Sequence, residues 1–186
     1  IPSRHNILNA VAAIAVGLDL GISVKSLCSS LTSFSGVDRR FQLKGAINGI
    51  TLIDDYAHHP TEIAVTLEAA KYLEHNRLVV VFQPHRYTRT QYCFGGFVRV
   101  LQEADLIFLT DIYAAGEEPI KGLTSNKLVS AIQKDGHQHT HYLNDLNQMS
   151  QLVSYLKDGD LVITMGAGNV WTVANSLLEE LMRKTH

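Results

Sequence analysis

The segment at residues 54–60, D-D-Y-A-H-H-P, places two carboxylates, a phenol and two imidazoles close together. Such groups can hold a ribose hydroxyl, bridge to a cation or phosphate, and donate to an anionic substrate. Capping and turn formation would explain one aspartate and Pro60, but they leave the rest of the set unexplained. A strand-like run precedes the segment and a helical pattern follows it. We therefore expect a ligand-binding loop at the carboxyl end of a strand.

A second strand-end segment, Q-P-H-R-Y-T-R-T at residues 83–90, carries Arg86 and Arg89 three positions apart. Each guanidinium is a planar fork that matches a carboxylate or phosphate, so the pair can clamp an anion. The alternative is a solvated polar loop. Its place after a strand favours an anionic ligand.

Two further segments follow predicted strands, at residues 111–120 and 166–169. Gly166 and Gly168 would let backbone amides approach a ligand at the start of the last helix, whose dipole favours negative charge. The sequence G-A-G-N lacks the third glycine of a dinucleotide fingerprint and follows the last strand instead of the first. This argues against a nicotinamide cofactor.

Near the beginning of the chain stand R-H-N-x-x-N at residues 4–9 and D-R-R-F at residues 38–41. An asparagine can pair with an adenine edge, and an arginine between domains can reach a polyphosphate. Helix capping by Asn6 and surface ion pairs of Arg39 and Arg40 are equally compatible with these residues.

Three histidines alternate at His137, His139 and His141 and would share one face of a strand, which raises the question of a metal site. Solvated positions at a sheet edge are favoured, because no carboxylate or cysteine joins the pattern. Cys28 and Cys93 lack disulfide or zinc spacing and are interpreted as packing residues.

The elements that must position these groups fall into two parts. Apolar residues at helical spacing predict helices over residues 6–20, ended by Gly21, and 24–31. Turn formers at residues 33–38 mark a boundary. We therefore expect one part at residues 1–38 and another at 39–186.

The second part alternates strand-like and helical runs. Asn48-Gly49 is a two-residue hairpin signal between strands at 41–47 and 50–54. Continuous apolar strands are typical of a sheet covered on both faces. The prediction is an α/β fold with a Rossmann-like, doubly wound, mostly parallel sheet and one antiparallel strand. Further strands are expected at 78–82, 106–111, 139–143 and 161–165, and helices at 61–73, 92–103, 125–134, 146–156 and 170–182.

Composition excludes several classes of protein. The 186 residues are 46% apolar with a formal charge of −2, so neither nucleic acid nor an anionic membrane surface is an expected partner. No apolar run approaches the ~20 residues of a membrane span. A cytoplasmic protein is expected. The chain opens without Met inside a helical pattern, so we expect a fragment of a longer polypeptide.

Taken together, these stretches resemble the Mur ligase family. The resemblance rests on R-H-N-x-L-N, F-S-G-V-D-R-R-F, D-D-Y-A-H-H-P-T-E, F-Q-P-H-R-Y-T-R-T, Y-A-A-G-E-x-P-I and G-A-G-N, in this order along nearly the whole chain. A murein-tripeptide ligase shares a similar D-x-A-H-H-P loop but is not expected to carry H-R-Y-T-R-T. That loop favours the alanine-adding member, and Ser3 in place of a glycine is a small departure.

The resemblance implies ATP-dependent addition of L-alanine to UDP-N-acetylmuramate in peptidoglycan precursor synthesis. ATP phosphorylates the muramate carboxylate, and the alanine amine attacks the resulting acyl phosphate. It also implies that residues 1–38 are the last helices of a central ATP-binding domain and that residues 39–186 are the C-terminal Rossmann-like domain. The missing N-terminal and central domains would be its partners, with ATP and Mg²⁺ as cofactors.

The resemblance also implies residue roles. On the ATP side, His5, Asn6 and Asn9 resemble adenine contacts, Arg40 the phosphate contact and Asp55 the ribose contact.

On the substrate side, the resemblance implies that the site includes the catalytic group of His58, Arg86 and Arg89. The full substrate-binding set would be Tyr56, His58, His85, Arg86, Arg89, Gly166 and Gly168. These are positioning and electrostatic roles, which suit acyl-phosphate chemistry.

The sequence contains no G-x-x-x-x-G-K-[ST] loop and no magnesium ligands in a family context, so we expect this chain alone to be inactive. One alternative is a free-standing Rossmann-like module that binds a phosphorylated small molecule. Another is a nicotinamide-dependent oxidoreductase, but D-D-Y-A-H-H-P stands where its glycine fingerprint would be.

Overall fold

The computed structural model describes residues 4–34, 36–144 and 149–184, without the side chains of residues 4, 5, 149 and 150. The chain divides into two compact units, Ile1–Asp38 and Arg39–His186.

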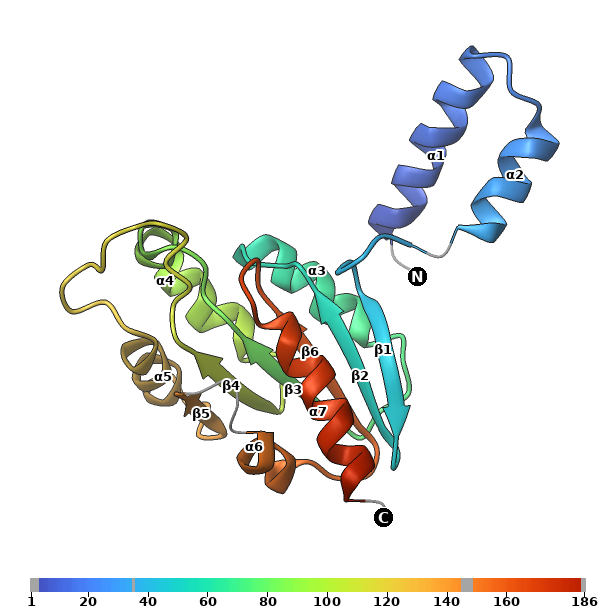
Figure 1. Cartoon of the computed structure of the whole chain (residues 1–186). Coiled ribbons are helices and arrows are strands. Elements are labelled where there is room, and N and C mark those ends of the chain that lie inside the picture. Colours follow the sequence, from blue (N-terminus) through green and yellow to red (C-terminus); the bar gives the residue numbers. More distant parts are fainter. Residues whose placement is uncertain (1–3, 35, 145–148, 185–186) are drawn as a thin grey trace. The chain divides into compact units, whose positions relative to one another are not determined.

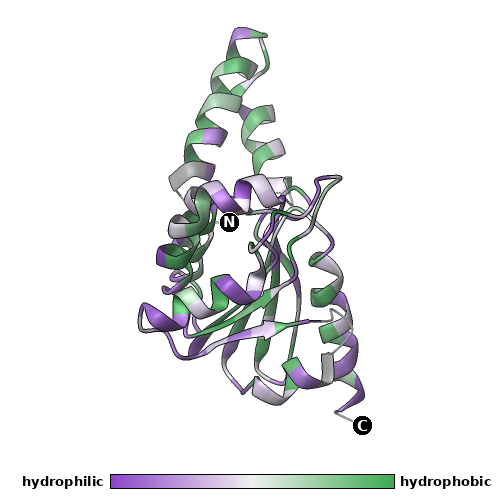
Figure 2. Cartoon of the chain, turned by 90° about the vertical axis from the view of Figure 1, so that its left-hand side faces the viewer, coloured by the Kyte–Doolittle hydropathy of each residue, from purple (hydrophilic) through white to green (hydrophobic). Residues whose placement is uncertain are grey.

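The first unit is a pair of helices, α1 (Arg4–Asp19) and α2 (Val24–Ser33). They approach closely at Gly17, where an added Cβ would lie 2.4 Å from the Leu27 side chain. Gly21 follows α1 with a φ of 77°, as a helix stop requires. Ile7 and Val11 remain 63% and 56% exposed, and much of α1 is hydrophobic in Figure 2. This helix pair therefore has little core of its own.

The second unit is built on one sheet with the strand order β1-β2-β6-β3-β4-β5. β1 is antiparallel to β2, and the other neighbouring strands are parallel. The predicted fold class is confirmed. The strands are β1 (Gln42–Ile47), β2 (Ile50–Asp55), β3 (Arg77–Phe82), β4 (Leu106–Thr110), β5 (Thr140–Leu143) and β6 (Asp160–Met165).

The predicted hairpin joins β1 to β2. Asn48 and Gly49 have φ angles of 51° and 70°, the left-handed pair that a tight two-residue turn needs.

Helices cover both faces of the sheet (Figure 1). Side chains along β3 alternate, so that Val80 and Phe82 join the core on one face and Val79 and Val81 the core on the other. This explains why the strand is apolar throughout. The first face is covered by α3 (Pro60–Ala70), α4 (Tyr87–Leu101) and α5 (Ser125–Lys134), and the second by α6 (Met149–Tyr155) and α7 (Trp171–Arg183).

The strand order creates a place for a ligand. β6 lies between β2 and β3, but its following helix α7 packs on the opposite face from α3 and α4. Loops that part to opposite faces leave a crevice at the carboxyl ends of the strands. The segments after β2, β3 and β6 meet at this edge.

Some of the predicted bounds were wrong. α4 begins at Tyr87 instead of residue 92, so Arg89 lies in its first turn. The carboxylate of Glu117 fixes that turn by accepting hydrogen bonds from the amide and hydroxyl of Thr88. β5 begins at Thr140, so His137 and His139 precede the strand.

We predict that Phe97→Ala destabilises the second unit by about 3–5 kcal/mol, because the fully buried ring packs against Phe82 and its loss leaves a cavity. The control is Tyr92→Ala on the same helix, where the side chain is 91% exposed and the cost should stay below about 0.5 kcal/mol. Urea unfolding followed by circular dichroism measures both, and equal costs would contradict the assigned core.

Candidate functional site

Arg39 ties the ends of β2 and β6 together. Its guanidinium donates to the carboxylate of Asp54 at 3.0 Å and to the carbonyl oxygens of Gly168 and Gly166. Asp54 is 1% exposed and also accepts a hydrogen bond from the Thr164 hydroxyl. The Arg39 carbonyl in turn accepts from the Tyr56 amide at 2.7 Å. Arg39 is therefore fully engaged inside the unit.

Arg40 is placed differently. It is exposed, and its guanidinium lies 5.6 Å from the centre of the Tyr56 ring, which also faces Arg39 at 5.1 Å. Its charge is one of the smaller effects that oppose the burial-driven rise in the pKa of Asp55, and it contributes to the lowered pKa of Glu62. Of the two adjacent arginines, Arg40 is the one that offers a guanidinium to an outside anion.

Asp55 is buried at the end of β2, with 6% of its surface exposed. Its oxygens accept hydrogen bonds from the Phe41 amide at 2.6 Å, the Ala57 amide at 2.7 Å and the Thr66 hydroxyl at 3.2 Å. Burial raises the pKa of this carboxyl, although these hydrogen bonds oppose the shift. An ionised carboxylate has about four acceptor positions, and these contacts use three of them.

His58 and His59 have separate tasks at the start of α3. The Nδ1 of His59 accepts from the Thr61 amide and caps the helix, while Glu62 accepts from the amides of both histidines. The His58 ring lies between those of Tyr56 and His85, with centroids 5.2 and 5.9 Å away. His59 thus belongs to the helix end, and His58 faces the loop after β3.

The surroundings of His85 favour its neutral form. Burial lowers the pKa of its imidazole, and the charges of Arg89, His58 and Arg86 add to the effect. The Nη1 of Arg89 lies 3.3 Å from His85 Nδ1. A guanidinium can only donate, so Nδ1 accepts and the ring proton is on Nε2. His85 therefore offers an N–H donor beside two arginines.

Arg86 is exposed and has a φ of 69°, an uncommon conformation for a residue with a side chain. Its amide donates to the Tyr113 carbonyl at 2.8 Å, which fastens the loop after β4 to the loop after β3. The conformation is therefore maintained by pairing between two loops.

The loop after β6 has no room for side chains at its glycines. An added Cβ would lie 2.8 Å from the Gln83 carbonyl oxygen at Gly166, and 2.3 Å from the Gln83 side-chain oxygen at Gly168. Gln83 is 4% exposed. The Nε2 of its side chain donates to the Asn169 side chain, and its Oε1 accepts from the Val170 backbone amide. Both glycines thus permit close packing between the loops after β3 and β6.

The structure brings together the predicted site residues of the second unit. They are Arg40, Asp55, Tyr56, His58, His85, Arg86, Arg89, Gly166 and Gly168, all in or beside the crevice loops.

The predicted adenine contacts lie on α1 of the first unit, and their role stays a prediction. The side chain of His5 is outside the described part of the chain; Asn6 and Asn9 are described.

The positioning roles of Gln83, Glu62 and Tyr113 were not predicted from the sequence, and for Arg39 a polyphosphate contact and a surface ion pair were both left open. Glu62 could have been found as the capping-box partner three positions after His59. The contacts of Gln83 and Tyr113 join segments far apart in the sequence, so no local pattern announces them.

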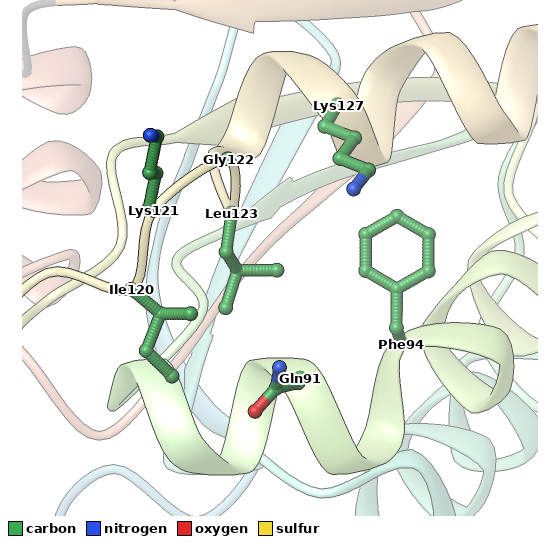
Figure 3. Close-up of a pocket in the computed structure, with 7 residues that line it drawn as sticks. All are labelled: Gln91, Phe94, Ile120, Lys121, Gly122, Leu123 and Lys127. Atoms are coloured by element: carbon green, nitrogen blue, oxygen red, sulfur yellow. The ribbon is translucent and has the colours of Figure 1, made fainter.

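Hollows also form among the described residues of the second unit. One of about 430 Å³ adjoins the crevice through Gln83, Tyr113 and Asn169. Another of about 170 Å³ lies between α4 and the start of α5, with Phe94 and Leu123 below Lys127 (Figure 3). No predicted site residue lines this smaller hollow.

Within the described residues, no group of three histidine, cysteine or acidic side chains is suited to a metal ion. His137 is occupied by the Ala104 carbonyl and the Thr140 hydroxyl. Among the same residues, no helix is long and apolar enough to cross a membrane.

Residues 39–168 match the family described as Mur ligase, glutamate ligase domain. The chain belongs to the Mur ligase family. A UDP-N-acetylmuramate–L-alanine ligase of Geotalea daltonii is 48% identical over 182 residues, which are 97% of this Mur ligase chain and 40% of that protein. The chain thus spans about two fifths of the length of such relatives.

Solved structures agree. The UDP-N-acetylmuramate–alanine ligase of Thermotoga maritima is 28% identical, with a TM-score of 0.81 over 99% of this chain and 39% of that one. A murein peptide ligase from Psychrobacter arcticus is also 28% identical, with a TM-score of 0.70 over 97% of this chain and 38% of the other. The Mur ligase resemblance seen in the sequence is confirmed.

For this Mur ligase chain we predict that Arg39→Ala costs about 3 kcal/mol of unfolding free energy, because it leaves the Asp54 carboxylate buried without its charge partner. Arg40→Ala is the matched control and should cost less than about 0.5 kcal/mol, since its side chain is exposed. Urea unfolding measures the free energy of unfolding of both variants. Equal losses of stability would contradict the assignment of Arg39, and not Arg40, to the buried ion pair.

We predict that His85 titrates below its ordinary pKa of 6.5. Its folded pKa is lowered, so the stability it contributes is complete above 6.5 and is lost as pH falls from there toward the folded pKa. Arg89→Gln should raise this pKa by removing a neighbouring charge.

Histidine NMR titration measures the shift. His141 is the internal control, because burial and His139, not Arg89, lower its pKa. A His85 pKa that Arg89→Gln does not move would refute the charge effect.

Proposed function

We propose that this chain supplies the alanine-binding and ATP-contacting part of an ATP-dependent UDP-N-acetylmuramate–L-alanine ligase. The single observation that carries the proposal is the group of Arg86, Arg89 and neutral His85 beside His58, in a chain 48% identical to a ligase of that name. The substrates would be L-alanine, UDP-N-acetylmuramate and ATP.

In the proposed reaction, ATP phosphorylates the muramate carboxylate and releases ADP. The alanine amine then attacks the acyl carbon, and phosphate leaves from the tetrahedral intermediate as the amide forms. Charge moves among oxygens throughout, so fixed donors and cations at those oxygens lower the barrier. A crevice with several such groups suits this chemistry.

On the alanine side, Arg86 and Arg89 would bind the substrate carboxylate. Their spacing allows two planar forks to face one anion, and Arg89 is held against His85. The Nε2–H of His85 would donate to a substrate oxygen. His58 and Tyr56 would line the reaction centre, with Gly166 and Gly168 closing it by their backbone.

On the ATP side, Arg40 would contact phosphate and Asp55 the ribose. The exposure of Arg40 and the remaining acceptor position of Asp55 support these roles. His5, Asn6 and Asn9 would contact adenine.

We further propose that α1 and α2 are the last helices of a central ATP-binding domain. Apolar side chains such as Ile7, Val11 and Leu20 are exposed, and large exposed apolar patches are rare on isolated soluble domains. We therefore expect the rest of that domain to pack against these side chains. The phosphate loop and the Mg²⁺ ligands would lie in that domain, in the part of the relatives that this chain does not span. Mg²⁺ would neutralise charge on the transferring phosphate, and the chain alone would be inactive.

The test is a chimera in which this chain replaces the matching segment of the Geotalea daltonii ligase. It should form ADP and phosphate only when alanine and UDP-N-acetylmuramate are both present. Arg89→Ala should raise the KM for alanine by about 10–100-fold, the value of one charge-assisted hydrogen bond. Mass spectrometry of the product identifies the amide.

Arg99→Ala is the control, because Arg99 is an exposed arginine on the same helix. It should leave kinetics unchanged. A folded chimera without alanine-dependent activity would contradict the proposed function. Alanine-dependent ATP hydrolysis by the isolated chain would contradict the proposal that this chain needs the rest of the enzyme.

A further inference from the structure

Tyr113 is held rigidly by its backbone. Its amide donates to the Pro84 carbonyl and its carbonyl accepts from the Arg86 amide, both at 2.8 Å. These bonds extend the pairing of β3 and β4 beyond the ends of the strands. Glu117, four residues on, is bonded to Thr88 at the start of α4. The segment that carries Tyr113 is thus anchored on both sides.

The ring of Tyr113 is 40% exposed and has defined neighbours on its covered side. It stacks on His85 with centroids 5.4 Å apart and planes 10° from parallel. It also fills the space beside Gly168, where an added Cβ would lie 2.6 Å from the ring. A side chain at position 168 would displace the ring, so this glycine and the tyrosine depend on each other.

Tyr113 also lines the larger hollow of about 430 Å³, hereafter called the cleft. It is far larger than the methyl group of alanine needs. Among the described residues that line it, Asp111 is the charged one, beside polar groups such as Asn144, Asn169 and Thr172. One oxygen of Asp111 accepts from the Tyr142 hydroxyl, which leaves the carboxylate further acceptor positions. The chemistry of the cleft suits a side chain that ends in a cation.

We propose that Tyr113 determines amino-acid size specificity by forming the wall between the His85 and Arg89 group and this cleft. The inference rests on the proposed function, because it assumes that the amino acid binds beside His85. With the ring in place, a long side chain has no path into the cleft. Without it, the cleft joins the site and Asp111 can pair with a basic side chain.

The first test uses the chimera with Tyr113→Ala and compares L-alanine with L-lysine. The ratio of kcat/KM for lysine to that for alanine should rise by at least about 10-fold, within the range that one pocket contact can discriminate. Tyr113→Phe keeps the ring and should leave the ratio unchanged. Tyr113→Leu, which retains an apolar side chain without the ring, should move the ratio in the same direction as alanine does. An unchanged ratio in both ring-deleted variants would overturn the proposal.

The second test does not need ligase activity. Titration of the isolated Tyr113→Ala chain with millimolar L-lysine should shift the NMR amide signals of Thr110, Asn169 and Thr172, and adding Asp111→Asn should abolish the shifts. The unsubstituted chain should show smaller shifts, because lysine can reach the exposed Asp111 from solvent alone. Equal shifts in the unsubstituted chain, or none in the variant, would refute the wall. An unsubstituted chimera that fails to use alanine would instead refute the proposed function.

Discussion

The pairing of Arg39 with Asp54 is the interaction on which the crevice depends. It joins the segment before β1, the end of β2 and the loop after β6, which are distant in the sequence. Because Asp54 is almost completely buried, its charge is tolerable only with a partner and further hydrogen bonds. The Arg39 guanidinium and the Thr164 hydroxyl supply these. Their geometry also fixes the carbonyls of Gly166 and Gly168.

Adjacent residues of the same type thereby acquire different functions. Arg39 and Arg40 are both arginines, as Asp54 and Asp55 are both aspartates, but one member of each pair is consumed by the structure. The turn before β1, where Arg39 has a φ of 59°, places the Arg39 guanidinium on Asp54 and leaves Arg40 exposed, whereas both aspartates are buried and differ in their partners. Arg40 keeps an exposed guanidinium, and Asp55 keeps a carboxylate that is not paired with an arginine as Asp54 is.

The crevice is organised by contacts within the chain. Burial and neighbouring cations lower the pKa of His85, and the Arg89 guanidinium, which can only donate, favours the tautomer with the proton on Nε2. The Tyr113 ring stacks on His85. The Gln83 side chain fixes the loop after β6 by hydrogen bonds to Asn169 and Val170. Groups whose positions are set in advance need little reorganisation during a reaction, and this is the main contribution a protein can make to acyl-phosphate chemistry.

Much of this molecule follows from local sequence. Apolar periodicity predicted the helices and strands, Asn48-Gly49 predicted the antiparallel hairpin, and polar clusters after apolar strands located the binding edge. Local pattern failed where a distant partner takes part: α4 starts five residues earlier than predicted, and Glu117 accepts hydrogen bonds from the amide and hydroxyl of Thr88 in its first turn. The sequence by itself determined which chemical groups stand at the strand ends. Only the tertiary structure decided which of them are free, because that depends on hydrogen bonds between segments up to 129 positions apart.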